Sequence, residues 1–188
     1  MQQDYICDML ELKDATLRVD GRELFRKLSL MAVDGQMTCV TGAAGAGKTA
    51  LLQVMLGFLT LDEGVVSIDG ELMTSLAAPS FRRLMAYVPQ RRRVSLEQTE
   101  VDTSGLEAVW APHNSRRYQL TPIDEHIDVE PMDSKPIIIV DDPEASLLGV
   151  LKSLAAAGHA VVVASRDEAF LNQSDKIVTL GNHDNFVS

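Results

Sequence analysis

The chain has 188 residues, and its 27 acidic and 17 basic residues give a formal net charge of −10. Hydrophobic residues make up 46% and charged residues 23% of the chain, the composition of an ordinary globular protein. The negative charge argues against general nucleic-acid binding, because an acidic surface repels a phosphate backbone. The two cysteines are too few for a zinc finger or a disulfide framework.

The sequence indicates neither a secretory signal nor a membrane-crossing helix. The first residues lack a basic segment followed by a long apolar one, so we expect no secretory signal. No uninterrupted apolar run approaches the ~18 residues of a membrane-crossing helix. We therefore expect a cytoplasmic protein with one domain over residues 1–188.

The first half of the chain predicts an antiparallel start followed by a loop and a helix. Alternating apolar residues over 9–19 and 24–33 flank the turn signal Asp20-Gly21-Arg22 and predict two strands. A compact apolar strand, a glycine-rich loop and a helix are expected next, over 37–41, 42–49 and 48–58. Shorter strands are expected over 65–68 and 84–88.

The last third predicts buried parallel strands. Residues 137–140 and 160–164 are continuous apolar runs, which is typical of strands buried on both faces. A helix that ends at Gly158 lies between them, and a helix near 167–172 and a strand over 177–180 follow. The predicted fold is α/β, with a mainly parallel central sheet, helices on both faces and an antiparallel β piece at the N-terminal side.

The segment between these regions has a different character. Residues 91–136 contain four prolines, the run Arg91-Arg92-Arg93 and little hydrophobic periodicity. One helix is expected near 103–110, and loops elsewhere. The arginine run fits either a solvated loop or an anion patch beside a ligand.

The glycine-rich loop carries the clearest chemistry. Residues 42–49, GAAGAGKT, match G-x-x-x-x-G-K-[ST] in full, between a predicted strand and a predicted helix. Small residues let backbone N–H groups converge on phosphates, and the helix N-terminus favours negative charge. Lys48 is expected to reach the β- and γ-phosphates and Thr49 to ligate Mg²⁺. A glycine-rich turn that binds nothing is the alternative.

A second acidic position completes the pattern. The buried strand at 137–140 leads to Asp141, which is expected to hold Mg²⁺ through water. A strand-end aspartate also occurs as a simple helix cap. Its pairing with a full phosphate loop favours the metal role.

With these motifs the chain resembles the ATP-binding cassette (ABC) ATPases over residues 9–90 and 136–181. The resemblance rests on the phosphate loop, the segment DEGVVSIDG at 62–70, the run Tyr87-Val88-Pro89-Gln90, the strand that ends in Asp141, and the segment VVVASRDEAFLNQSDKIVTL at 161–180. It implies a P-loop NTPase fold that binds ATP and Mg²⁺. A small kinase is the competing P-loop class, but no arginine-rich lid supports it.

The resemblance also assigns residues. It implies that the nucleotide contacts Gly42, Ala43, Ala44, Gly45, Ala46, Gly47, Lys48, Thr49 and Ala50. It implies Thr49, Gln90 and Asp141 as metal ligands, and Gln90 and Asp142 as the catalytic pair beside the attacking water. Asp142 stands where the family has a glutamate.

Several family features are absent from the sequence. The Leu-Ser-Gly-Gly-Gln signature is missing, and residues 91–135 are too short for the family's helical subdomain, so we expect a truncated remnant there. Leu148 and Arg166 occupy the D-loop acid and switch histidine positions. Arg166 fits a surface residue or a fixed cation at the γ-phosphate. The adenine-stacking aromatic near Val19 is missing, with Tyr5 and Phe25 as the candidates to replace it.

Two functions follow from this resemblance. One is an ABC ATP-binding protein with weak or partner-dependent hydrolysis, which works with a second cassette, as a homodimer or heterodimer, and with a membrane permease. The other is a degenerate, non-hydrolysing cassette that regulates or scaffolds a complete ABC protein. In both, the chain is cytoplasmic, or is held at the inner face of the membrane through a partner.

Overall fold

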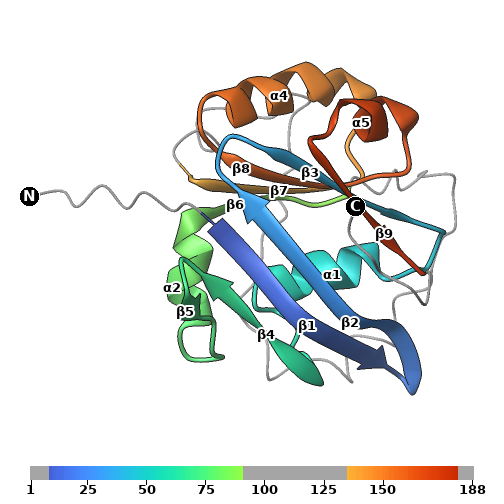
Figure 1. Cartoon of the computed structure of the whole chain (residues 1–188), viewed down its shortest axis with the longest axis vertical. Helices are drawn as coiled ribbons and strands as arrows, with labels where there is room; N and C mark the ends of the chain where they lie inside the picture. The colour runs from blue at the N-terminus through green and yellow to red at the C-terminus, as the bar shows by residue number, and fades with distance from the viewer. Residues whose placement is uncertain (1–8, 91–134, 182–188) are drawn as a thin grey trace, which may run out of the picture. The chain divides into compact units, whose positions relative to one another are not determined.

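Two β-sheets organise the computed structural model, which describes residues 9–90 and 135–181 (Figure 1). The elements in chain order are β1 (Met9–Val19), β2 (Arg22–Val33), β3 (Met37–Gly42), α1 (Lys48–Met55), β4 (Glu63–Ile68), β5 (Glu71–Leu72), α2 (Ala78–Phe81), η1 (Arg82–Leu84), β6 (Met85–Val88), β7 (Ile137–Asp141), η3 (Ala145–Leu147), α4 (Leu148–Ala156), β8 (Ala160–Ala164), α5 (Glu168–Gln173) and β9 (Lys176–Leu180).

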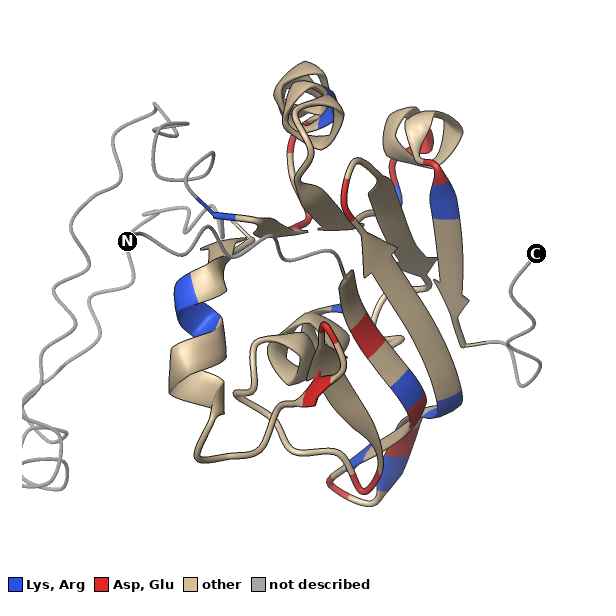
Figure 2. Ribbon diagram, turned by 60° about the vertical axis from the view of Figure 1, so that its left-hand side comes forward, with Lys and Arg blue, Asp and Glu red and all other residues tan. Residues whose placement is uncertain are grey.

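The N-terminal strands form the predicted antiparallel piece. The first sheet has the order β2-β1-β4-β5, and every neighbouring pair is antiparallel. A two-residue turn joins β1 to β2, with Asp20 at φ 51° and Gly21 at φ 74°. Two successive left-handed residues match the right-handed twist of a hairpin, which explains why Asp-Gly stands here. Charged side chains gather along this hairpin, whereas β3 and β8 carry none (Figure 2).

The second sheet is parallel throughout, in the order β6-β7-β8-β3-β9. Every residue of β7 and β8 is buried, which explains why these strands are continuous apolar runs in the sequence. Helix α1 packs on one face of this sheet and α4 and α5 on the other (Figure 1). The predicted α/β class, the parallel sheet and the helices on both faces are confirmed.

Helix α1 lies between the two sheets and fills the main core. Its side chains Leu51, Leu52 and Met55 are fully buried and pack with apolar residues of both sheets. The helix ends before the predicted residue 58, because Gly57 adopts a left-handed φ of 68°. The Arg82 guanidinium then donates to the carbonyl oxygens of Leu56 and Gly57, at 3.1 and 3.4 Å. These bonds satisfy carbonyls that the helix end would otherwise leave unpaired.

Several expectations fall outside the described residues. They include the helix near 103–110, the run Arg91-Arg92-Arg93 and all but the last residue of the predicted remnant 91–135. The division into a core over 9–90 and 136–181 and a shortened remnant therefore stays a prediction. In the ranges 9–90 and 135–181, no helix is long and apolar enough to cross a membrane.

The buried strand β7 gives a direct test of the core. Ile139 has no exposed surface, and we expect Ile139→Ala to reduce the free energy of unfolding by about 2–5 kcal/mol, because it leaves a cavity that the sheet cannot close. Ile177 on the edge strand β9 is 45% exposed, and Ile177→Ala is the matched control, with an expected loss of about 1 kcal/mol or less. Urea unfolding followed by circular dichroism measures both; equal losses would contradict this packing.

Candidate functional site

The carboxyl ends of the parallel strands carry most of the predicted site residues. Parallel pairing places these ends along one edge of the sheet. Gln90 follows β6, Asp141 ends β7, Arg166 follows β8, and the glycine-rich loop follows β3. The fold thus joins residues that lie far apart in the chain.

The loop from Gly42 to Thr49 has a backbone that only glycine allows at its first position. Gly42 has a φ of 147°, and a Cβ atom there would lie 2.7 Å from the carbonyl oxygen of Leu180 in β9. A side chain would therefore separate the loop from the sheet. The loop turns back on itself through a hydrogen bond from the Ala46 N–H to the Ala43 carbonyl, at 3.1 Å. Gly47 then precedes the first residue of α1.

Lys48 points into this loop. Its Nζ donates to the carbonyl oxygens of Gly42 and Ala43, at 2.7 and 3.0 Å. Loss of solvent around the ammonium lowers the pKa of Lys48, the Arg166 charge lowers it further, and Asp142 and Asp141 act in the opposite direction. The cation is therefore held at the centre of the loop by main-chain oxygens.

Thr49 and Asp141 form the second part of the site. The Thr49 hydroxyl donates to Asp141 Oδ2 at 2.8 Å, and Asp141 is only 4% exposed. Burial raises the pKa of the Asp141 carboxyl, and the Thr49 hydrogen bond opposes this rise. A hydroxyl beside a buried carboxylate is a set of hard oxygen donors that fits Mg²⁺.

A cation at Thr49 and Asp141 needs further ligands. Within the described ranges, no group of three or more His, Cys, Asp or Glu residues converges as a metal site. Mg²⁺ prefers an octahedral set of oxygens and commonly takes some from phosphates and water. The donor set therefore suits a metal that arrives with a phosphorylated ligand.

Gln90 and Asp142 complete this side of the site. Gln90 Nε2 donates to Asp142 Oδ2 at 2.7 Å. Both residues line a cavity of about 380 Å³, together with Leu24, Ala44, Gly45, Gly47, Lys48, Thr49, Ala50, Asp141 and Arg166. The cavity therefore combines two cations, two carboxylates and the loop that the sequence predicts for phosphates.

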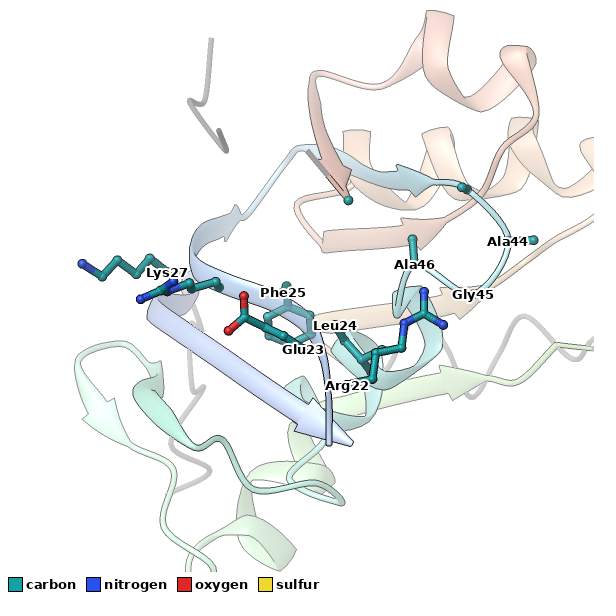
Figure 3. A pocket seen from close by; sticks show the side chains of 11 residues that line it. Arg22, Glu23, Leu24, Phe25, Lys27, Ala44, Gly45 and Ala46 are labelled. Atoms are coloured by element: carbon teal, nitrogen blue, oxygen red, sulfur yellow. The ribbon is translucent and has the colours of Figure 1, made fainter. Parts of the chain in front are cut away.

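A larger cavity, of about 540 Å³, adjoins the first (Figure 3). Its walls are β2 from Arg22 to Lys27 and the loop from Ala43 to Ala46, with Gly181 at the end of β9. The two cavities share Leu24, Ala44 and Gly45. Figure 3 places the Arg22 guanidinium beside the loop.

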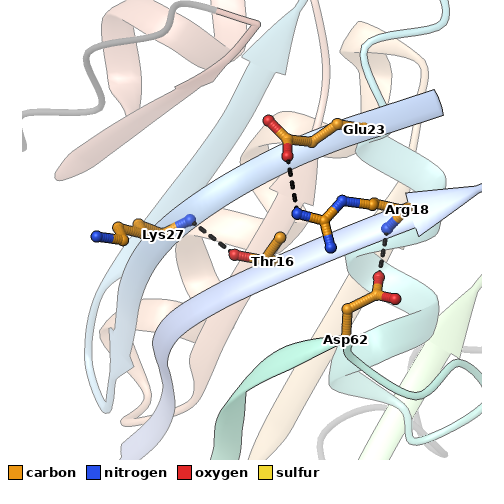
Figure 4. Close-up of polar contacts among 5 residues, drawn as sticks. All are labelled: Thr16, Arg18, Glu23, Lys27 and Asp62. Atoms are coloured by element: carbon orange, nitrogen blue, oxygen red, sulfur yellow. Dashed lines mark hydrogen bonds and ion pairs between the residues drawn. The ribbon is translucent and has the colours of Figure 1, made fainter. Parts of the chain in front are cut away.

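The β1–β2 hairpin holds this wall in place (Figure 4). The Arg18 N–H donates to Asp62 at 2.6 Å, and its guanidinium pairs with Glu23 at 3.3 Å. The Lys27 N–H donates to the Thr16 hydroxyl at 3.2 Å. Because Glu23 faces Arg18, the larger cavity keeps a net positive wall from Arg22, Arg26 and Lys27.

The structure brings most of the sequence-predicted residues together, and three residues of the loop lie outside the smaller cavity. Lys48, Thr49, Gln90, Asp141 and Asp142 line one cavity, whereas Ala43 and Ala46 line only the larger one and Gly42 lines neither. Phe25 lines the larger cavity, but it is only 4% exposed and packs in the hydrophobic core, which leaves its ring little surface for stacking. Tyr5 lies outside the described residues. Arg166, for which a surface position and a phosphate contact are both expected from the sequence, is exposed and lines the smaller cavity.

The basic wall on β2 was not predicted. Arg22, Arg26 and Lys27 stand out only as a cluster of positive charge in an acidic chain, a signal that a solvated strand also gives. Their place at the cavity follows from β2 being an edge strand next to the loop.

Known proteins of similar sequence include two import ATP-binding proteins. One is the Fe(3+) ions import ATP-binding protein FbpC 2 of Pectobacterium atrosepticum, 33% identical over 44% of this chain and 24% of that protein. Another is the hemin import ATP-binding protein HmuV of Rhizobium meliloti, 33% identical over 53% of this chain and 39% of that protein. The chain thus spans less than half the length of these relatives.

Solved structures share the fold of this chain, and a family model matches its sequence. An ATP-binding subunit of an ABC transporter has a TM-score of 0.64 and 19% identity, over 92% of this chain and 85% of that one. A bacterial Atm1-family ABC exporter with ATP bound has the same TM-score and 18% identity, over 93% of this chain and 37% of that one. The family model described as ABC transporter matches residues 25–145, more than half of the chain. This chain therefore belongs to the ABC transporter family.

Proposed function

We propose that the chain binds ATP with Mg²⁺ at the loop from Gly42 to Thr49, as the ATP-binding component of an ABC system. The observation that carries the proposal is the meeting of Lys48, Thr49 and Asp141 in one cavity. Membership of the ABC transporter family supports ATP as the nucleotide.

The residues act in distinct ways. Lys48 leaves the carbonyl oxygens of Gly42 and Ala43 and donates to the phosphates, which the loop N–H groups also bind. Thr49 and Asp141 hold the metal, and Gln90 completes its surroundings. Bound Mg²⁺ supplies charge neutralisation on the phosphate oxygens. Arg166 acts as a fixed cation on the terminal phosphate, a role supported by its place in the cavity wall.

The larger cavity takes the nucleoside. It begins where the phosphate cavity ends, at Leu24, Ala44 and Gly45, so one extended ligand fits both. Phe25 is buried, so among the described residues of this cavity the planar guanidinium groups of Arg22 and Arg26 are candidates for stacking on a base. We choose Arg22 because it lies beside the loop (Figure 3).

Hydrolysis is proposed to be slow in the isolated chain. Asp142 is the acid assigned to the attacking water, but the signature motif is missing from the sequence and Leu148 replaces the D-loop acid. A second cassette that supplies a signature across the site is the partner that this gap favours. A membrane permease is the further partner, and it places the chain at the inner face of the membrane.

The alternative is a cassette that binds ATP and regulates or scaffolds a complete ABC protein. The observation that favours it is the combined loss of the signature motif and of the D-loop acid. Turnover in the presence of a complete cassette separates the two functions, because only the first gains hydrolysis from a partner.

Lys48→Ala should weaken binding of Mg·ATP. The variant loses a charge-assisted bond to phosphate, and such bonds contribute about 1.5–3 kcal/mol, which corresponds to about ten- to a hundredfold in affinity. Isothermal titration calorimetry measures both dissociation constants. Lys152→Ala is the control, because Lys152 is an exposed residue of α4 that bonds Gln173 and lines neither cavity. Equal affinity of the Lys48 variant and the wild type would refute the site.

Arg22→Ala should weaken ATP binding by about three- to tenfold, because a guanidinium over an aromatic ring contributes about 0.5–2 kcal/mol. Binding of inorganic tripolyphosphate should stay unchanged, since it lacks a base. Competition calorimetry measures both ligands, with Arg83→Ala, an exposed residue of η1, as the control. A parallel loss for both ligands would mean that Arg22 contacts phosphates instead, and no loss would exclude Arg22 as the stacking group.

ATP turnover by the purified chain should lie below the ordinary enzyme range of ~1–10³ s⁻¹. Asp142→Glu alone should not raise it into that range, because groups that act together in a transition state are not repaired one at a time. A phosphate-release assay measures the rate constants of both forms. A wild-type rate constant inside the range would contradict slow hydrolysis while leaving ATP binding intact.

A further inference from the structure

We propose that Asp142 is a positioning residue. It fixes the orientation of the Gln90 side-chain amide, so that the carbonyl oxygen of Gln90 faces the metal site and can bind the metal. The inference rests on the proposed Mg·ATP site and assigns a role to one of its acids. It follows from the hydrogen bond of 2.7 Å between Gln90 Nε2 and Asp142 Oδ2.

The amide of Gln90 has two chemically different ends. Nε2 is a donor and Oε1 is an acceptor, and the two exchange places when the amide rotates by half a turn. A carboxylate has only acceptor oxygens, so Asp142 selects the orientation in which Nε2 faces it. Among the described residues, no hydrogen bond reaches Gln90 Oε1, so this oxygen stays available in the cavity that Thr49 and Asp141 also line.

The fold holds both members of the pair. Gln90 follows β6 and Asp142 follows β7, and these strands are paired in parallel, with Val88 opposite Val140. The backbone N–H of Asp142 donates to the carbonyl oxygen of Ala164 at the end of β8, at 2.8 Å. Asp142 thereby keeps a left-handed φ of 47°, which aspartate tolerates better than most residues. The main chain at Asp142 is thus tied to the sheet, and its exposed side chain reaches Gln90 from this fixed position.

The hydrogen bond between Gln90 and Asp142 also affects which other roles Asp142 can have. Its Oδ2 is occupied by an amide hydrogen in this arrangement, which leaves Oδ1 as the other acceptor. Two rival roles predict different behaviour: a direct metal ligand would act independently of Gln90, and a surface contact would not influence the metal. A positioning role acts only through Gln90.

A double-mutant cycle tests the proposal. Dissociation constants for ATP are measured with Mg²⁺ and with EDTA for the wild type, Gln90→Ala, Asp142→Ala and the double variant, and their ratio gives the gain from Mg²⁺. Partners that orient a metal ligand usually change metal affinity by about 10–100-fold, so we expect each single variant to lose about tenfold of this gain. The double variant should lose no more than Gln90→Ala alone.

A conservative variant separates orientation from charge. Asp142→Asn removes the negative charge but still offers one acceptor oxygen to Gln90 Nε2, so this variant should retain the gain from Mg²⁺ to within about threefold of the wild type. A direct metal ligand that depends on the negative charge of Asp142 would make this variant behave like Asp142→Ala. Glu144→Ala is the matched control, since this exposed acid follows Asp142 closely in the chain and lines neither cavity.

The outcomes distinguish this inference from the proposed function. ATP binding in EDTA reports that a variant is folded. A wild type that gains affinity from Mg²⁺ and an Asp142→Ala variant that gains as much would overturn the positioning role alone, as would losses that multiply in the double variant. A wild type without any gain from Mg²⁺ would overturn the metal site and this inference together.

Discussion

Parallel pairing of five strands is the constraint on which the rest of this structure depends. It forces the carboxyl ends of β6, β7, β8, β3 and β9 onto one edge, and every group of the proposed phosphate and metal site except Leu24 lies at or after one of those ends. Every residue of β7 and β8 is buried, and close packing leaves such side chains little room to rearrange. The packing of the core strands therefore sets where Asp141 and the start of the glycine-rich loop lie.

Much of this arrangement could be predicted from the sequence, because the decisive signals are local. A phosphate loop needs small residues and a lysine at fixed spacing, which GAAGAGKT supplies. The all-apolar run before Asp141 predicts a strand buried on both faces. The early end of α1 was missed because the apolar pattern continues to Phe58, while the left-handed backbone of Gly57 ends the helix. Hydrophobic periodicity reports burial, and it does not report where the backbone turns.

Contacts between distant segments were harder to predict. The basic residues of β2 line the larger cavity because β2 is an edge strand that lies beside the loop. No spacing in the sequence predicts that these two segments are neighbours. Phe25 was a candidate for stacking because it is aromatic, but its ring is used by the core. The hydrogen bond between Gln90 and Asp142 likewise joins two motifs 52 positions apart, and only the register of β6 on β7 brings them into contact.

The surroundings of Lys48 would couple the binding of a phosphorylated ligand to the protonation state of its side-chain amine. Its ammonium is desolvated among carbonyl oxygens, which lowers its pKa, whereas a phosphate beside it would favour the charged form and raise the pKa again. A ligand that raises the pKa of a group takes up protons in the pH range between the free and bound values. Affinity for a phosphorylated ligand therefore falls as the pH rises through the lowered pKa of Lys48, at a less alkaline pH than for a lysine in water. Phosphate binding at this loop would thus be coupled to the protonation state of Lys48, whose pKa is lowered by burial and by the Arg166 charge.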